Sequence, residues 1–118
     1  MSETSQPQPS EDISIQERLR SAAKSAVEAV LDPSTVYAHV QVPQWVSEIN
    51  KRTIEALLSS QRPHERLAVN TVVVRRSTAP FYSASAAYWN DATDSLVSYR
   101  WTNADIVCVV TVFALVTS

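Results

Sequence analysis

Apolar residues recur three or four positions apart between residues 15 and 31, which is the spacing of one face of an α-helix. Ser14 and Glu17 match a capping box, so this helix is predicted to begin at Ser14. Pro33 disfavours helical geometry in the preceding Asp32 and ends the helix there. The predicted apolar stripe consists of Ile15, Leu19, Ala22, Ala23, Ala26, Val27, Val30 and Leu31.

A second helix is predicted to begin near Val42 and Pro43, because proline is tolerated in the first turn of a helix. Residues 59–63 contain polar side chains and a proline, which end this helix. Its apolar stripe consists of Trp45, Val46, Ile49, Thr53, Ile54, Leu57 and Leu58. The first half of the chain therefore holds two amphipathic helices.

The second half of the chain favours strands. β-Branched and aromatic residues are concentrated in four stretches, which we interpret as strands: 66–76, 81–89, 96–101 and 105–116. The stretches between them contain Asn, Asp and Pro, which are turn residues. Two helices followed by four strands predict an α+β domain.

Both faces of the last predicted strand are apolar. One face carries Ile106, Cys108, Val110, Val112, Ala114 and Val116, and the other carries Val107, Val109, Thr111, Phe113 and Leu115. A strand of this kind is normally covered on both sides, and two helices cover only one. We therefore expect a second chain to cover the other face.

Composition narrows the possible functions. The chain has 118 residues, 45% hydrophobic and 19% charged, which is typical of one globular domain. Residues 1–11 are poor in apolar side chains, so they are predicted to form a disordered tail before a domain of residues 12–118. The sequence contains no glycine, which excludes the glycine-rich loops that cradle phosphates.

The polar composition points to neither a metal nor a cofactor. Cys108 is the single cysteine and there are two histidines, too few for a tetrahedral zinc site. A net charge of −2 gives no general attraction to nucleic acid. The longest uncharged run, residues 106–118, is too short to span a membrane as a helix. We expect no cofactor, no metal, no nucleic acid and no membrane partner.

Catalysis is an alternative that the sequence disfavours. His39 or His64 would act as a base for a serine nucleophile, with Asp91 or Asp94 orienting the ring. Both histidines fall in predicted loops, and no serine lies in a nucleophile-elbow sequence. A non-enzymatic protein is therefore favoured over a small hydrolase.

Two further groups have alternative interpretations. Arg75 and Arg76 either attract an acidic partner or protect a strand end from aggregation. The large aromatics either stack on bases or fill a core or dimer seam, and packing is favoured because no basic stripe runs between them. These aromatics are Trp45, Tyr82, Tyr88, Trp89, Tyr99 and Trp101.

Residues 81–87 form a candidate peptide-binding strand. The segment has small side chains in its middle and carries no charge, whereas exposed edge strands usually carry charges or proline. We therefore expect both of its edges to be paired, one by a sheet and the other by an extended client peptide. The residues are Phe81, Tyr82, Ser83, Ala84, Ser85, Ala86 and Ala87.

An ordered set of short motifs runs through residues 13–118. It comprises Val42-Pro43-Gln44-Trp45, Ser83-Ala84-Ser85, Tyr88-Trp89-Asn90-Asp91, Thr93-Asp94, Arg100-Trp101 and Phe113-Ala114-Leu115. In this order the chain resembles the Tctex-type dynein light chains. Ala79, Ser95 and Ala114 stand near positions where that family commonly has glycine.

The resemblance implies a four-stranded antiparallel sheet in a strand-exchanged dimer that binds a segment of the dynein intermediate chain by β-strand addition. Tyr88, Trp89, Val107 and Val109 are then expected at the dimer interface, with an identical chain or a related light chain as partner. The resemblance places such a chain in the cytoplasm on the cytoskeleton, in a cytoplasmic or an axonemal motor of the cilium. The alternative is a cargo or signalling adaptor of the same fold outside dynein.

Overall fold

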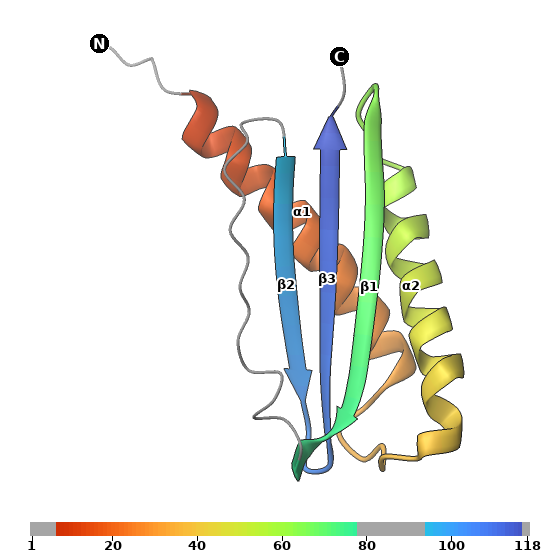
Figure 1. The fold of residues 1–118 in the computed structure, drawn as a ribbon. Coiled ribbons are helices and arrows are strands. Elements are labelled where there is room, and N and C mark those ends of the chain that lie inside the picture. Colours follow the sequence, from red (N-terminus) through yellow and green to blue (C-terminus); the bar gives the residue numbers. More distant parts are fainter. Residues whose placement is uncertain (1–6, 78–93, 117–118) are drawn as a thin grey trace.

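The computed structural model describes the backbone of residues 7–77 and 94–116, and the side chains of residues 15–77 and 95–116. Two helices pack beside an antiparallel sheet (Figure 1). In chain order the elements are α1 (Pro7–Val30), the 3-10 helix η1 (His39–Gln41), α2 (Val42–Leu58), β1 (Glu65–Arg75), β2 (Asp94–Thr102) and β3 (Ile106–Val116).

Helix α1 begins earlier than its sequence pattern indicated. It starts at Pro7, so the predicted start at Ser14 is wrong, and residues 7–11 belong to the helix instead of the predicted tail. Pro7 and Pro9 lie in its first turn, where a backbone N–H has no acceptor within the helix and its loss costs nothing. The end of α1 at Val30 agrees with the stop predicted before Pro33.

The predicted stripes of both helices form most of the core. Helix α2 runs from Val42 to Leu58, as predicted, and buries Ile49, Thr53 and Leu57. The Thr53 hydroxyl donates to the Ile49 carbonyl at 2.8 Å, which satisfies a buried polar group. Leu58 departs from the prediction, because 52% of it is exposed. The buried residues of α1 are Leu19, Ala22, Ala23, Ala26 and Val27, followed by Leu31 just after the helix.

The described sheet has three strands in the order β1-β3-β2, and both pairings are antiparallel. β3 is central, with Val109 opposite Val72 of β1 and Arg100 of β2. Three of the four predicted strands therefore correspond to observed strands, with ends shifted by at most two residues. The remaining predicted strand, residues 81–89, lies outside the described residues.

Alternation along β3 separates the core from the opposite face. Its even-numbered residues from 106 to 114 are fully buried and pack with the apolar stripes of the two helices. The odd-numbered residues point to the other side of the sheet, where Val109, Thr111, Phe113 and Leu115 are half-buried. Among the described helices, none is long and apolar enough to cross a membrane.

Candidate functional site

The sheet face turned away from α1 and α2, here called the open face, lacks a cover in the described part of the chain. Apolar and polar side chains share it, and most are half-buried or exposed. Ser98 of β2 and Thr111 of β3 approach each other across it, with their hydroxyl oxygens 3.4 Å apart. Its apolar members are Ala68, Val72, Val74, Leu96, Val107, Val109, Phe113 and Leu115.

The hydrogen-bond pattern shows which residues of β2 direct their backbone groups outward. The Asn103 N–H donates to the Ile106 carbonyl at 3.0 Å, and this pair continues the β2–β3 register. Hydrogen-bonded pairs alternate along an antiparallel ladder, so the odd-numbered residues of β2 bond to β3. The residues with outward N–H and C=O groups are Leu96, Ser98, Arg100 and Thr102.

The outer edge of β2 has the properties of a strand-addition site. No described strand pairs with it, because β2 is the last strand of the sheet. The outward residues Ser98, Arg100 and Thr102 have exposed side chains on the open face. An added strand would bond to this edge and extend the open face at the same time.

A polar cluster at the β2–β3 turn holds this hairpin in place. The Asn103 amide nitrogen donates to the carbonyls of Thr35 and Asp32, at 2.8 and 3.1 Å. Its side-chain oxygen accepts the N–H groups of Asp105 and Ile106, each at 2.8 Å. One side chain therefore ties the hairpin to the loop between the helices.

Arg75 and Arg76 make contacts within the chain, which bears on the two interpretations of this pair. The Arg75 guanidinium carbon lies 4.9 Å from the centre of the Tyr37 ring, a cation–π arrangement. The Arg76 guanidinium donates to the Asn103 carbonyl at 3.0 Å. Both arginines therefore help to hold the chain where it leaves β1.

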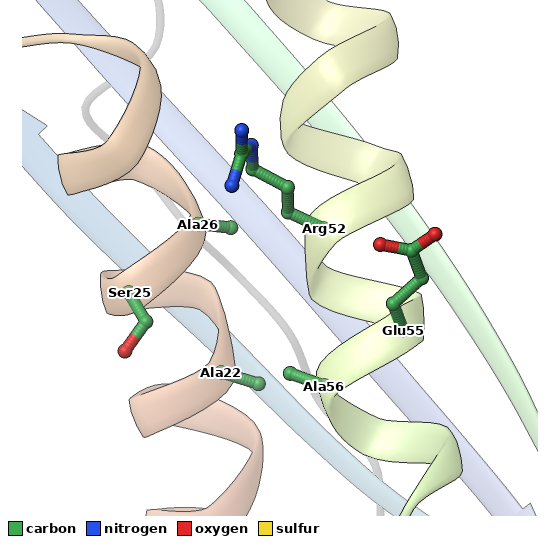
Figure 2. Close-up of a pocket in the computed structure, with 6 residues that line it drawn as sticks. All are labelled: Ala22, Ser25, Ala26, Arg52, Glu55 and Ala56. Atoms are coloured by element: carbon green, nitrogen blue, oxygen red, sulfur yellow. The ribbon is translucent and has the colours of Figure 1, made fainter.

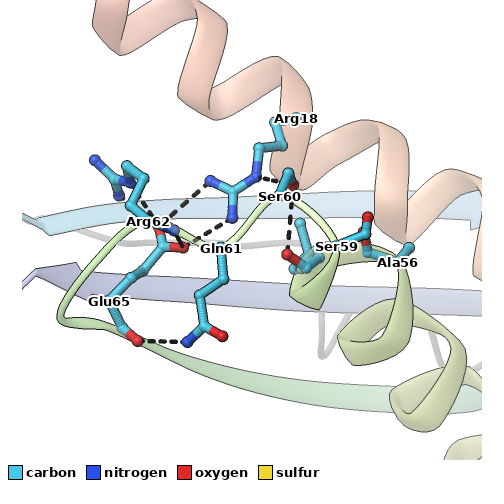
Figure 3. A network of polar contacts seen from close by, with 8 residues as sticks. Arg18, Ala56, Ser59, Ser60, Gln61, Arg62 and Glu65 are labelled. Carbon is cyan, nitrogen blue, oxygen red and sulfur yellow. Dashed lines mark hydrogen bonds and ion pairs between the residues drawn. The ribbon is translucent and has the colours of Figure 1, made fainter.

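A buried carboxylate joins α1 to the start of β1 (Figure 3). The Glu65 side chain is 0% exposed and lies 2.8 Å from the Arg18 guanidinium and 2.6 Å from that of Arg62. Burial alone would raise the pKa of Glu65, but hydrogen bonds from both arginines and from the Arg62 N–H outweigh burial and lower it from 4.5 to about 2. The carboxylate is therefore charged and structural.

A hollow of about 360 Å3 lies between α1 and α2 (Figure 2). Alanine methyl groups from the two helices face each other across it, and Arg52 and Glu55 of α2 stand at its side. Ligand sites in proteins usually have apolar and aromatic walls with a few converging polar groups. This lining indicates close helix packing and not a ligand site.

Comparison with known proteins places the chain in a family. The model of the Tctex-1 family matches residues 14–115. The chain is 34% identical over 97 residues to a protein named dynein light chain Tctex-type from Dictyostelium discoideum, covering 82% of this chain and 86% of that protein. The chain belongs to the Tctex-1 family.

Animal members of the Tctex-1 family show comparable similarity. Dynein light chain Tctex-type of Drosophila melanogaster is 29% identical over 92 residues, or 78% of this chain and 81% of that protein. Human dynein light chain Tctex-type 3 is 28% identical over 99 residues, which is 84% of each chain. The resemblance inferred from the short motifs is thereby confirmed.

Ser95 and Ala114, two of the three residues that stand near positions where the family commonly has glycine, lie in the sheet. Ser95 of β2 and Ala114 of β3 are directly opposite each other in the ladder. Within the described residues His64 is the one residue with a positive φ, so neither position needs glycine. Ala79 lies outside the described residues.

The structure describes part of the predicted binding site. Val107 is 1% exposed and Val109 is half-buried, and both belong to the open face. Tyr88, Trp89 and the candidate peptide strand 81–87 lie outside the described residues. The interface and peptide-binding roles of all these residues remain predictions.

The histidines of the alternative catalytic interpretation are far apart in the fold. His39 precedes α2 and His64 follows it, so a helix of 17 residues, about 25 Å long, separates them. The Nδ1 atom of His39 lies 3.5 Å from the phenol oxygen of Tyr37. Burial raises the pKa of the Cys108 thiol to about 12, so this thiol stays protonated and is a poor nucleophile.

Packing explains the aromatic residues that the structure describes. Trp45, Tyr99 and Trp101 are partly buried against the hydrophobic core, as the packing interpretation predicted. No group of three or more His, Cys, Asp and Glu side chains suited to a metal ion occurs in the described ranges. The sequence analysis did not identify the residues of β2 whose backbone groups face outward, because an edge strand can be identified only when the sheet order is known.

Proposed function

We propose that this chain is a non-catalytic dynein light chain that dimerises and binds a segment of the dynein intermediate chain. Its membership of the Tctex-1 family and its similarity to proteins named dynein light chain Tctex-type support the dynein role. The observation that carries the structural part of the proposal is the outer edge of β2, with which no described strand pairs and which adjoins the partly apolar open face. No cofactor is needed for such a role.

The proposed dimer uses strand exchange. Residues 81–89 of one copy add to the outer edge of β2 in the other copy, and the open faces become covered. We place Val107 and Val109, with Tyr88 and Trp89, at this interface. Val109 offers apolar surface to the partner, whereas Val107 is 1% exposed and already buried within its own chain. The partner is a second copy of the chain or a related Tctex-type light chain.

The proposed client site is the exchanged strand. Residues 81–87 have small, uncharged side chains, which let a peptide backbone come close. After one edge of this strand has paired with the sheet of the partner, its other edge is left for an extended intermediate-chain segment. Main-chain hydrogen bonds then supply affinity, and neighbouring side chains supply selectivity.

We propose that the chain works in the cytoplasm, in a dynein motor on the microtubule cytoskeleton. The alternative location is an axonemal dynein of a cilium. A cargo or signalling adaptor outside dynein would use the same surfaces. Affinity purification of the tagged chain followed by mass spectrometry separates these roles. Recovery of dynein heavy and intermediate chains supports the motor role, and their absence contradicts it.

Two neighbouring proline substitutions test strand addition. Ser83→Pro and Ala84→Pro each remove one backbone N–H, and successive residues of a strand direct these groups to opposite sides. We expect one variant to lose dimerisation, and the other to stay dimeric and bind an intermediate-chain peptide at least about tenfold more weakly, or ~1.4 kcal/mol.

Calorimetric titration of the peptide measures the affinity, and light scattering measures the association state. If both variants remain dimers and bind like the parent chain, residues 81–87 are not the client site.

A further inference from the structure

We propose that the outer edge of β1 is a second strand-addition site, which binds an extended segment of another protein with alternating apolar and acidic side chains. This edge lies on the opposite side of the sheet from β2, with β3 between them (Figure 1). It is therefore separate from the dimer and client surfaces proposed above, and it does not depend on them.

The ladder between β1 and β3 identifies the outward groups of this edge. The Arg76 N–H donates to the Asp105 carbonyl at 2.8 Å, in continuation of the β1–β3 register. Alternation then directs the N–H and C=O groups of even-numbered β1 residues to β3 and those of odd-numbered residues outward. The outward residues that follow Glu65 are Leu67, Val69, Thr71 and Val73.

Glu65, the first outward residue of this edge, already has hydrogen-bond partners within the chain. The Gln61 side chain donates to the Glu65 carbonyl at 2.6 Å, and the Glu65 N–H donates to the Arg62 carbonyl at 3.1 Å (Figure 3). Beyond Glu65, no described residue hydrogen-bonds to the outward backbone groups of residues 67–73. Within the described part of the chain, these four alternate residues therefore keep donors and acceptors that an added strand could use.

Helix α2 provides an apolar wall beside the same edge. Thr71 donates its hydroxyl proton to the side-chain oxygen of Asn50 in α2 at 2.6 Å, and Gln61, three residues after the end of α2, donates to the Glu65 carbonyl. Helical spacing places Ile54 and Leu58 between Asn50 and Gln61 on that side of α2. Leu58 is 52% exposed, although it belongs to the apolar stripe of the sequence. An added strand would cover this side chain.

The charges near this edge favour an acidic occupant. Arg66 of β1 is exposed and lies opposite Leu115 in the ladder, so its side chain belongs to the open face beside this edge. Alternate side chains of an added strand would face α2 and the open face, which places its apolar residues beside Leu58 and its acidic residues beside Arg66. The Glu65 carboxylate is buried and bound by Arg18 and Arg62. The Glu55 carboxylate of α2 points away from α1 and stands four residues after Lys51, so these two charges offset each other on the helix side of the edge (Figure 2). Apart from Glu65, β1 carries no acidic residue. The free charge beside the edge is therefore positive.

A fluorescein-labelled octapeptide of alternating valine and glutamate is the probe for this site, and the matched peptide contains lysine in place of glutamate. We expect fluorescence anisotropy to show at least tenfold tighter binding of the glutamate peptide to the full chain. Leu58→Glu, which keeps a helix-forming residue at an exposed position, should weaken that binding at least tenfold.

Two matched proline variants locate the site. Val69→Pro removes one outward N–H from β1, and Ser98→Pro removes one outward N–H from β2, so neither breaks a ladder bond. Val69→Pro should reduce binding of the glutamate peptide at least tenfold, and Ser98→Pro should change it less than twofold. Ser98→Pro reports on the proposed dimer instead, so failure of one proposal leaves the other intact.

Amide hydrogen exchange of the wild-type chain gives a readout that needs no variant. Saturating glutamate peptide should slow exchange at Leu67, Val69 and Thr71 at least tenfold and leave Ser98 unchanged. Absence of this protection, or equal binding of the two peptides, overturns the proposal. A change in association state caused by Val69→Pro also overturns it, because the edge would then pair two copies of the chain.

Discussion

Glu65 is buried at the start of β1, and its charge is held by two arginines that come from different parts of the chain. Arg18 belongs to α1 and Arg62 to the turn before β1. A buried ion pair of this kind contributes little net stability relative to apolar packing, but removing one partner is costly. The side chain therefore fixes how the first helix meets the sheet.

Glu65→Gln should lower the free energy of unfolding by about 2 kcal/mol or more at pH 7, because it leaves two guanidinium groups without their anion. The folded-state pKa of Glu65, about 2, lies below the usual 4.5, so the unfolded state binds more protons between these values. The stability contributed by Glu65 is fully present above about pH 5 and is lost as the pH falls toward 2.

Urea unfolding of both proteins between pH 7 and pH 2 checks this prediction. The difference between wild type and Glu65→Gln should shrink as the pH falls. Glu48→Gln is the matched control, because Glu48 pairs with Arg52 at the exposed surface, and its loss should cost less than about 0.5 kcal/mol. A pH-independent difference at Glu65 would contradict the assigned charge.

His64 has a φ of 61°, which a β-branched side chain tolerates poorly and asparagine tolerates well. His64→Val should therefore be less stable than His64→Asn by about 1 kcal/mol or more. Both variants lose the histidine ring, so their difference isolates the backbone effect. Equal urea midpoints for the two variants would show that this turn relaxes without cost.

At the scale of elements, the β2–β3 hairpin depends on Asn103. Asn103→Ala removes four hydrogen bonds and should cost about 2–3 kcal/mol of unfolding free energy. Asn103→Asp keeps the acceptor for Asp105 and Ile106 but loses both donors. A carboxylate oxygen would then face the carbonyls of Asp32 and Thr35, so this variant should be destabilised mainly at the loop between the helices.

Hydrogen exchange distinguishes the two Asn103 variants. Asn103→Ala should speed exchange at the Asp105 and Ile106 amides, whereas Asn103→Asp should leave their protection close to wild type. Equal loss of protection in both variants would mean that the side-chain oxygen does not hold the turn.

Local signals were enough to predict most elements, and the failures have physical causes. Pro33 and Pro43 correctly marked the end of α1 and the start of α2. The start of α1 was missed, because Pro7 and Pro9 are typical both of a disordered tail and of a first helical turn. Leu58 was assigned to the buried stripe, because spacing alone does not show how far the sheet extends beside the helix.

The candidate site was less predictable than the elements. Alternation along β3 correctly separated the face of Val110 from that of Val109. The outward groups of β1 and β2 could not be predicted, because they depend on the order β1-β3-β2 and on the hairpin pair Asn103–Ile106. The strand order is set by the pairing of β1 with β3, which lie far apart in the chain, and alternation alone does not show which residue of the short turn forms the first hydrogen-bonded pair.

At the scale of the whole molecule, the two faces of β3 serve different purposes. Val110 is 0% exposed in the core, so Val110→Asp should prevent folding by burying an unpaired charge. Val109 is half-buried on the open face, so Val109→Asp should fold but remain monomeric. Circular dichroism and light scattering of both variants test this; a dimeric Val109→Asp would exclude Val109 from the interface.

Sedimentation velocity of the wild-type chain and of Ser98→Pro tests most directly whether the edge of β2 pairs with a second chain. We predict that wild type at about 10 μM sediments with twice the 13.1 kDa mass of the chain. Ser98→Pro, which loses one outward N–H but no ladder bond, should keep its circular dichroism spectrum and sediment as a monomer. A monomeric wild type, or a Ser98→Pro variant that dimerises as tightly as wild type, would contradict the proposed strand-exchanged light chain.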